Sequence, residues 1–171
     1  MGKTGQYYLI KQDRRLENSP EILGFFNTFF DRQELKDRSN TLYVRDHPDI
    51  YYPDFIDRPL LLVSDEFKSI LKVYHKDYEY RAVVLTEKER KVQNVYWNIV
   101  IPETDCLSVE SSYYLNKTLN KMVIDHKKTE GRSLFKITNM RRTIYIIRLD
   151  LAESILRRNL CGFLLEELES V

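Results

Sequence analysis

Cysteine, histidine and glycine are scarce in this chain of 171 residues, which contains two cysteines, three histidines and five glycines. Cys106 and Cys161 fit neither a disulfide framework nor a metal knuckle, so we expect both to be reduced, buried structural thiols. His47, His75 and His126 form no paired metal motif. A glycine-rich phosphate loop, a dinucleotide fingerprint and a nucleophile elbow are also missing. The sequence therefore predicts no enzyme activity, no metal and no cofactor.

One catalytic alternative stays open at this stage. Cys106 with His126, or Cys161 with any histidine, could form a nucleophilic pair if the fold brought thiol and imidazole together. Leu107 flanks the first thiol and Phe163 lies close to the second in sequence. These apolar neighbours favour burial of both thiols over catalysis.

The chain also lacks long hydrophobic runs and an excess of one charge. No apolar segment approaches the roughly 20 residues of a membrane helix, and no signal-peptide core occurs. We therefore expect a cytoplasmic protein without membrane contact. The net charge does not indicate a class of partner, because 27 Lys and Arg residues balance 26 Asp and Glu residues. The proportions of hydrophobic (43%) and charged (31%) residues are typical of folded, soluble domains.

An internal echo is the clearest architectural feature. The patterns of residues 58–87 and 142–169 each predict an apolar strand, a short amphipathic helix and a second apolar strand. Shifted by 84 positions, the helix residue Phe67 falls on Leu151. The pattern predicts two similar strand-helix-strand units that share one core.

Helix signals precede the first of these units and recur within both. Ser19-Pro20-Glu21 predicts a helix start, followed by apolar residues at helical spacing up to Phe29. Ser64 is expected to cap the helix of the first unit. Arg148 occupies the matching position in the second unit, so we expect that cap to move to Asp150. With a possible helix after Ser108, about three to four helices are predicted.

Strand signals are spread over the whole chain. They predict an α+β fold with mixed, mainly antiparallel sheets in a single domain over residues 1–171, with a possible subdivision near 103–118. The expected strands cover residues 6–11, 41–44, 60–63, 78–85, 95–101, 119–125, 134–138, 143–147 and 163–168.

An acidic, aromatic loop is the first candidate binding site. Aromatic rings supply contact area and carboxylates steer a basic protein surface toward the loop. Two alternatives remain, a solvated loop and a loop that docks back onto its own core. The candidate residues are Asp46, Asp49, Tyr51, Tyr52, Asp54, Phe55 and Asp57.

A basic segment, residues 117–148, is the second candidate. It contains nine Lys and Arg residues against two acids, interleaved with Phe135 and Tyr145. Such a surface could track a phosphate backbone, so the alternative function is a nucleic-acid-binding module. The exposed face of a sheet would show the same alternation. The candidate residues are Lys121, Lys127, Lys128, Arg132, Lys136, Arg141 and Arg142.

Several short motifs resemble those of a bacterial family, the immunity protein 11 family, formerly a domain of unknown function. They are Tyr7-Tyr8-Leu9-Ile10, the segment from Pro59 to Phe67, Tyr96-Trp97-Asn98-Ile99 with Asp105-Cys106-Leu107, and Leu134-Phe135-Lys136-Ile137 through Gly162-Phe163. Arg148 departs from the Ser or similar cap expected before the last helix. The resemblance implies that the protein neutralises a cognate secreted toxin in the cell that makes it, by stoichiometric binding and without catalysis. It transfers no catalytic residue and leaves the oligomeric state open.

Overall fold

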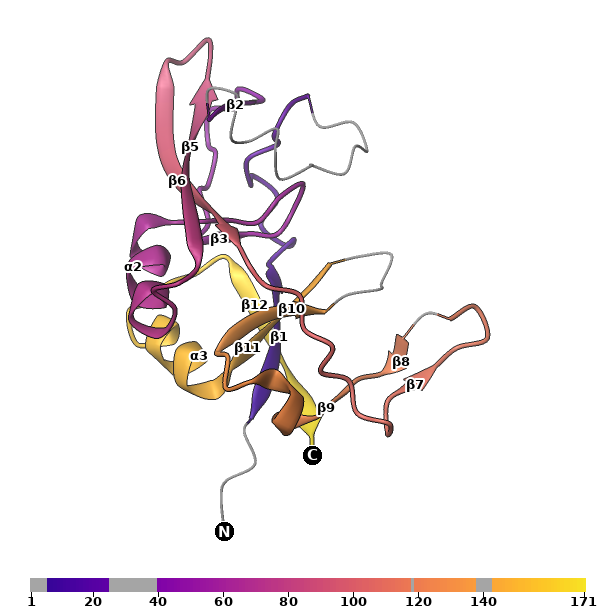
Figure 1. Cartoon of the computed structure of the whole chain (residues 1–171). Coiled ribbons are helices and arrows are strands. Elements are labelled where there is room, and N and C mark those ends of the chain that lie inside the picture. The colour runs from indigo at the N-terminus through magenta and orange to yellow at the C-terminus, as the bar shows by residue number, and fades with distance from the viewer. Residues whose placement is uncertain (1–5, 25–39, 118, 138–142) are drawn as a thin grey trace.

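The protein consists of two mixed sheets with a pair of α-helices on one side and a two-stranded hairpin projecting from the other side (Figure 1). A computed structural model describes residues 6–24, 40–117, 119–137 and 143–171. Strand pairing is antiparallel except between β12 and β9 and between β2 and β5. The expected α+β class with mainly antiparallel pairing is confirmed.

The elements of the described residues fall into three sheets, two α-helices and one 3-10 turn. The first sheet has the order β10 (Leu134–Ile137), β11 (Ile144–Arg148), β1 (Tyr7–Gln12), β12 (Phe163–Ser170) and β9 (Val123–Ile124). The second has the order β2 (Thr41–Val44), β5 (Glu79–Glu87), β6 (Val92–Val100), β4 (Leu62–Val63) and β3 (Phe55–Ile56). The hairpin pairs β7 (Ser112–Tyr113) with β8 (Leu119–Lys121), and the helical elements are α2 (Asp65–Tyr74), α3 (Leu149–Leu156) and the 3-10 turn η1 (His126–Thr129).

The described residues contain two α-helices, so the expectation of three to four is wrong for this part of the chain. Ser19 does not start a helix, because its hydroxyl donates to the Leu16 carbonyl (3.0 Å) and Ile22 pairs as a β-bridge with Val44. The remainder of that expected helix, residues 25–30, lies outside the described residues. After Ser108 the chain makes a turn, since the Ser111 N–H donates to the Ser108 carbonyl (3.0 Å).

The two helices begin differently, as their sequences indicate. Ser64 caps α2, its hydroxyl accepting the Phe67 N–H at 3.2 Å. Arg148 occupies the N-cap of α3 without a side-chain cap bond, so the expected move of the cap to Asp150 is wrong. The Asp150 carboxylate instead binds the Arg148 guanidinium (2.7 Å) and accepts the Leu151 N–H (2.9 Å). An acidic residue in the first turn also suits the positive end of the helix dipole.

Both helices bury their apolar faces in one cluster between the sheets. Phe67 and Leu71 of α2 pack in the same cluster as Leu151 and Ile155 of α3. These are the positions that the 84-residue shift superimposes. Figure 1 shows the two helices side by side, on the side of the molecule opposite the β7–β8 hairpin.

Residues 102–108, which we call the strap, join the two edge strands of the first sheet. At one end Glu103 pairs with Lys136 of β10, and the Thr104 N–H donates to the Lys136 carbonyl (2.9 Å). At the other end Leu107 pairs with Ile124 of β9. The strap therefore occupies both exposed edges and covers a core cluster that includes Cys106.

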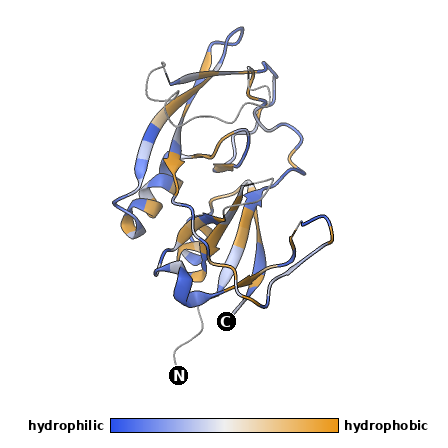
Figure 2. Ribbon diagram, turned by 45° about the vertical axis from the view of Figure 1, so that its right-hand side comes forward, coloured by the Kyte–Doolittle hydropathy of each residue, from blue (hydrophilic) through white to orange (hydrophobic). Residues whose placement is uncertain are grey.

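The second sheet has its own apolar layer, formed with the loop that precedes β3. Ile56, Leu62, Val83 and Leu85 form part of this cluster, and Ile50 and Tyr52 of the loop pack against it. Figure 2 shows hydrophobic residues concentrated along the strands, whereas the turn between β5 and β6 is hydrophilic. The acidic loop is thus built onto the second sheet.

Candidate protein-binding surface

Asp54 and Tyr51 hold the acidic loop to the turn before β12. The Asp54 carboxylate accepts the Cys161 N–H at 2.8 Å, and the Tyr51 hydroxyl lies 2.6 Å from the Cys161 sulfur. That hydrogen bond, together with burial, raises the pKa of Tyr51 to about 12. Gly162 lies so close that a β-carbon there would be 2.2 Å from the Pro53 β-carbon. This end of the loop is therefore fastened to the body.

The other polar residues of the loop are also engaged. Asp57 accepts the Gln12 N–H (3.1 Å) and the Arg14 guanidinium (2.6 Å). Asp46 accepts the N–H groups of Glu89 and Arg90 in the β5–β6 turn, at 3.1 and 3.2 Å. These carboxylates connect the loop to other segments by hydrogen bonds, which leaves them less available to a partner.

Tyr52 and Phe55 point inward. The Tyr52 hydroxyl donates to the buried Glu87 carboxylate at 2.7 Å, and burial with that hydrogen bond raises the pKa of Tyr52 to about 12. Phe55 is fully buried against Phe67 and Tyr145. Of the seven candidate residues, Asp49 and Tyr51 are the exposed ones. Most of the loop's aromatic surface is therefore packed inside the protein and is not available to a partner.

The two thiols occupy different environments. Cys106 is buried, which raises its pKa to about 11. Cys161 is exposed, so the expectation that both thiols are buried is wrong: it precedes Gly162, which permits the chain reversal into β12 with φ +85°. Among the described residues neither thiol is hydrogen-bonded to a histidine. His126 accepts or donates at the Tyr7 hydroxyl (2.7 Å) instead.

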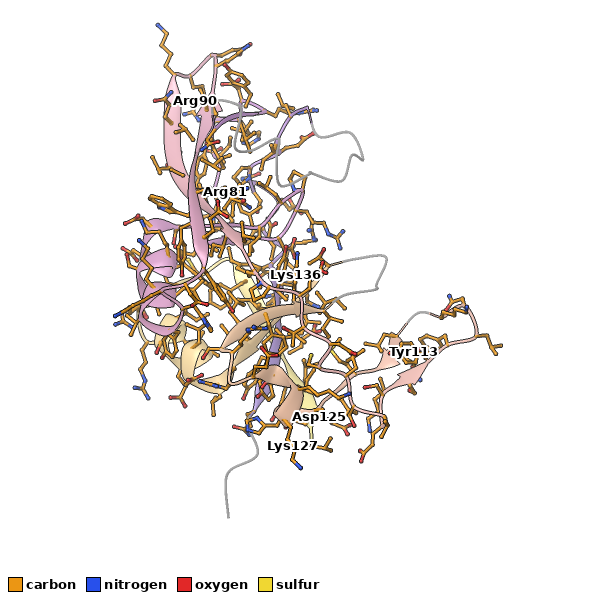
Figure 3. All side chains as sticks on the ribbon, in the orientation of Figure 1. Arg81, Arg90, Tyr113, Asp125, Lys127 and Lys136 are labelled. Carbon is orange, nitrogen blue, oxygen red and sulfur yellow. The ribbon has the colours of Figure 1, made fainter. Side chains whose placement is uncertain are left out.

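Four of the five described basic candidates are engaged with acids or with backbone. Lys121 pairs with Glu169 (2.7 Å) and Arg132 with Glu130 (2.7 Å). Lys136 pairs with Glu103 (3.5 Å), and the Lys128 ammonium donates to the Leu107 carbonyl (2.9 Å). Lys127 is exposed on η1 (Figure 3). Residues 141 and 142 lie outside the described residues.

A third surface was not anticipated from the sequence. We call residues 109–121 the arm; it contains the β7–β8 hairpin and projects from the body, as the position of Tyr113 in Figure 3 shows. Val109 is 97% exposed, Tyr113 is 56% exposed and Tyr114 is 58% exposed, while Leu115 is completely exposed. Single exposed apolar residues are ordinary, but four within seven positions on one projection mark an interaction surface.

The tip of the arm is a tight turn. The Lys117 N–H donates to the Tyr114 carbonyl at 2.9 Å, and Lys117 adopts φ +62°. Leu115 and Asn116 therefore occupy the two central positions of the turn. The base is tied down, because the Ser111 hydroxyl bonds both the N–H and the carbonyl of Val123, at 3.1 Å each. The string Ser-Ser-Tyr-Tyr-Leu-Asn, apolar residues within a turn-rich stretch, is the signal that could have revealed it.

The remaining concave features are small. One cavity of about 160 Å³ lies between α2 and α3 and is lined by residues that include Val73 and Arg158. Another, of about 150 Å³, is lined by residues that include Glu21, Arg45 and His47. Within the described ranges no three His, Cys, Asp or Glu side chains gather as metal ligands, and no helix there is long and apolar enough to cross a membrane.

Comparison with known proteins does not assign the chain to a family. No family model matches the chain, and no curated protein matches it either. The resemblance to the immunity protein 11 family therefore stays a prediction.

Proposed function

We propose that this chain is a bacterial immunity protein, which neutralises a cognate secreted toxin by stoichiometric protein-protein binding in the cytoplasm. The exposed apolar arm is the observation that carries this proposal. Each of its four apolar residues is more than half exposed, and apolar area on a projection is what a binding protein offers to a partner. The motif resemblance supplies the class of partner.

The proposed activity needs no catalytic step and no cofactor. The Cys106–His126 pair that sequence analysis left open is not formed, because His126 bonds Tyr7 and Cys106 is buried with a raised pKa. A thiol with such a pKa is protonated at neutral pH and a poor nucleophile. Three of the described basic candidates, Lys121, Arg132 and Lys136, are paired with acidic side chains, which favours a protein partner over a nucleic acid.

The proposal is tested with the cognate toxin domain, which should be encoded by a gene adjacent to that of this chain. The two proteins should co-purify after co-expression as a complex with one copy of each, and added protein should abolish toxin activity at an equimolar ratio. A catalytic antidote would act at far lower ratios. The proposal is wrong if the toxin stays fully active in excess protein and no complex forms.

A further inference from the structure

The arm tip has the chemistry of an anchor. Residues 109–121 contain two lysines and one acidic residue, Glu110. Lys121 is exposed at the base, where it pairs with Glu169, and Lys117 is exposed at the tip. Leu115 stands at the corner of the turn between Tyr114 and this lysine. The tip is therefore an apolar knob with one positive charge beside it.

We propose that the arm inserts Leu115 into an apolar pocket of the partner protein whose rim carries a carboxylate that pairs with Lys117. This inference rests on the proposed function and names the partner surface that the function requires. A convex projection needs a concave receptor, and a fully exposed leucine gains most by complete burial. Tyr113 and Tyr114 flank the knob and supply amphipathic contact area around the pocket.

Two other occupants fit the observations less well. A lipid surface is held by clusters of lysine or arginine, at about 1 kcal/mol for each such residue. The arm offers two exposed lysines, of which Lys121 is paired with Glu169, and it also carries the acidic Glu110, so lipid binding should be weak. A second copy of this chain would need an apolar pocket, whereas the two cavities described above are each lined in part by charged side chains, Glu21 and Arg45 in one and Arg158 in the other.

Matched pairs of variants test the anchor on the intact chain with the adjacent toxin domain. Leu115→Ala should raise the Kd at least about tenfold, which corresponds to about 1.4 kcal/mol. Val73→Ala removes an aliphatic side chain that is 75% exposed on α2, and it should change the Kd less than about twofold. Denaturant unfolding of both variants should match that of the wild type.

The charge is tested separately. Lys117→Glu should weaken binding, more at low salt than at high salt, because an exposed ion pair is screened. Lys127→Glu makes the same charge change on η1, away from the arm (Figure 3), and should have the smaller effect.

The outcomes separate the two proposals. If wild-type protein binds the toxin and Leu115→Ala and Lys117→Glu bind equally well, the arm inference is overturned while the proposed function stands. If the wild type forms no complex, both fall. Two further results overturn the inference in favour of other occupants: loss of binding to phosphatidylglycerol vesicles in Leu115→Ala, or concentration-dependent dimers of the wild type that this variant abolishes.

Discussion

The acidic loop and the arm are both rich in tyrosine, yet the structure uses them in opposite ways. The loop's Tyr52 and Phe55 pack into the body, and its carboxylates bond backbone N–H groups of three other segments. The arm's Tyr113 and Tyr114 remain exposed on a projection. Residue type therefore indicates that a segment could bind a partner. Whether its side chains stay available depends on the contacts that they make within the fold.

The contrast should be greatest for aromatic side chains. Phe55→Ala should lower the free energy of unfolding by roughly 3–5 kcal/mol, because it opens a cavity in the core. Tyr114→Ala should lower it by less than about 0.5 kcal/mol, because an exposed arm residue has little to lose. Urea unfolding of both variants measures the difference. Comparable losses would show that the arm packs against the body in solution.

The contact between the acidic loop and the turn before β12 can also be disrupted by a substitution in that turn, at Gly162. Gly162→Ala places a β-carbon 2.2 Å from that of Pro53 and holds a non-glycine residue at φ +85°. We expect a loss of roughly 1–3 kcal/mol from overpacking and about 1 kcal/mol from backbone strain. Gly131→Ala is the matched control, with φ +72° and nothing within 4 Å of the added carbon. Equal losses in the two variants would mean that the loop moves aside freely.

Two aspartates of the loop should also differ. Asp54→Ala removes the acceptor for the Cys161 N–H and should lower the free energy of unfolding by about 1–2 kcal/mol. Asp49→Ala, at an exposed position, should leave the unfolding curve unchanged. If Asp49→Ala weakens toxin binding without changing stability, the loop keeps a share of the interface.

The smallest effect should appear at alkaline pH. Because the folded state raises the Tyr52 pKa from 10.0 to about 12, the unfolded chain loses this proton first. The contribution to stability is complete below about pH 10 and is lost as the pH rises from there toward about 12. Tyr52→Phe should therefore make stability fall less steeply across this range, and the phenolate absorbance step near pH 12 should diminish. An unchanged step would show that the Glu87 contact does not persist.

Local signals allowed much of the fold to be predicted. Ser64 with Asp65 and Glu66 marks the start of α2, and Gly162 marks the reversal into β12. These features depend on a few neighbouring residues, which the sequence displays directly. The same reasoning was wrong at Ser19, where pairing between Ile22 and Val44 replaced the expected helix.

The candidate surface was less predictable, because it depends on contacts between distant segments. From the sequence, Asp57 was expected to be a charge that steers a partner. In the structure its carboxylate accepts the Gln12 N–H of β1 instead. The strands of the arm are two and three residues long, too short for a clear alternation of apolar and polar residues. The full exposure of Leu115 becomes apparent only once its position in the hairpin is known.

The strap has a consequence for the order in which the protein is assembled. β5 and β6 pair through a short turn and can form as soon as both have emerged from the ribosome. β1, by contrast, must wait for β11 and β12, which follow it by more than a hundred residues. Until then β10 and β9, the two strands that the strap contacts, lack their partner strands β11 and β12. The first sheet, with the strap along its edges, is therefore expected to be completed only when β12 has been synthesised.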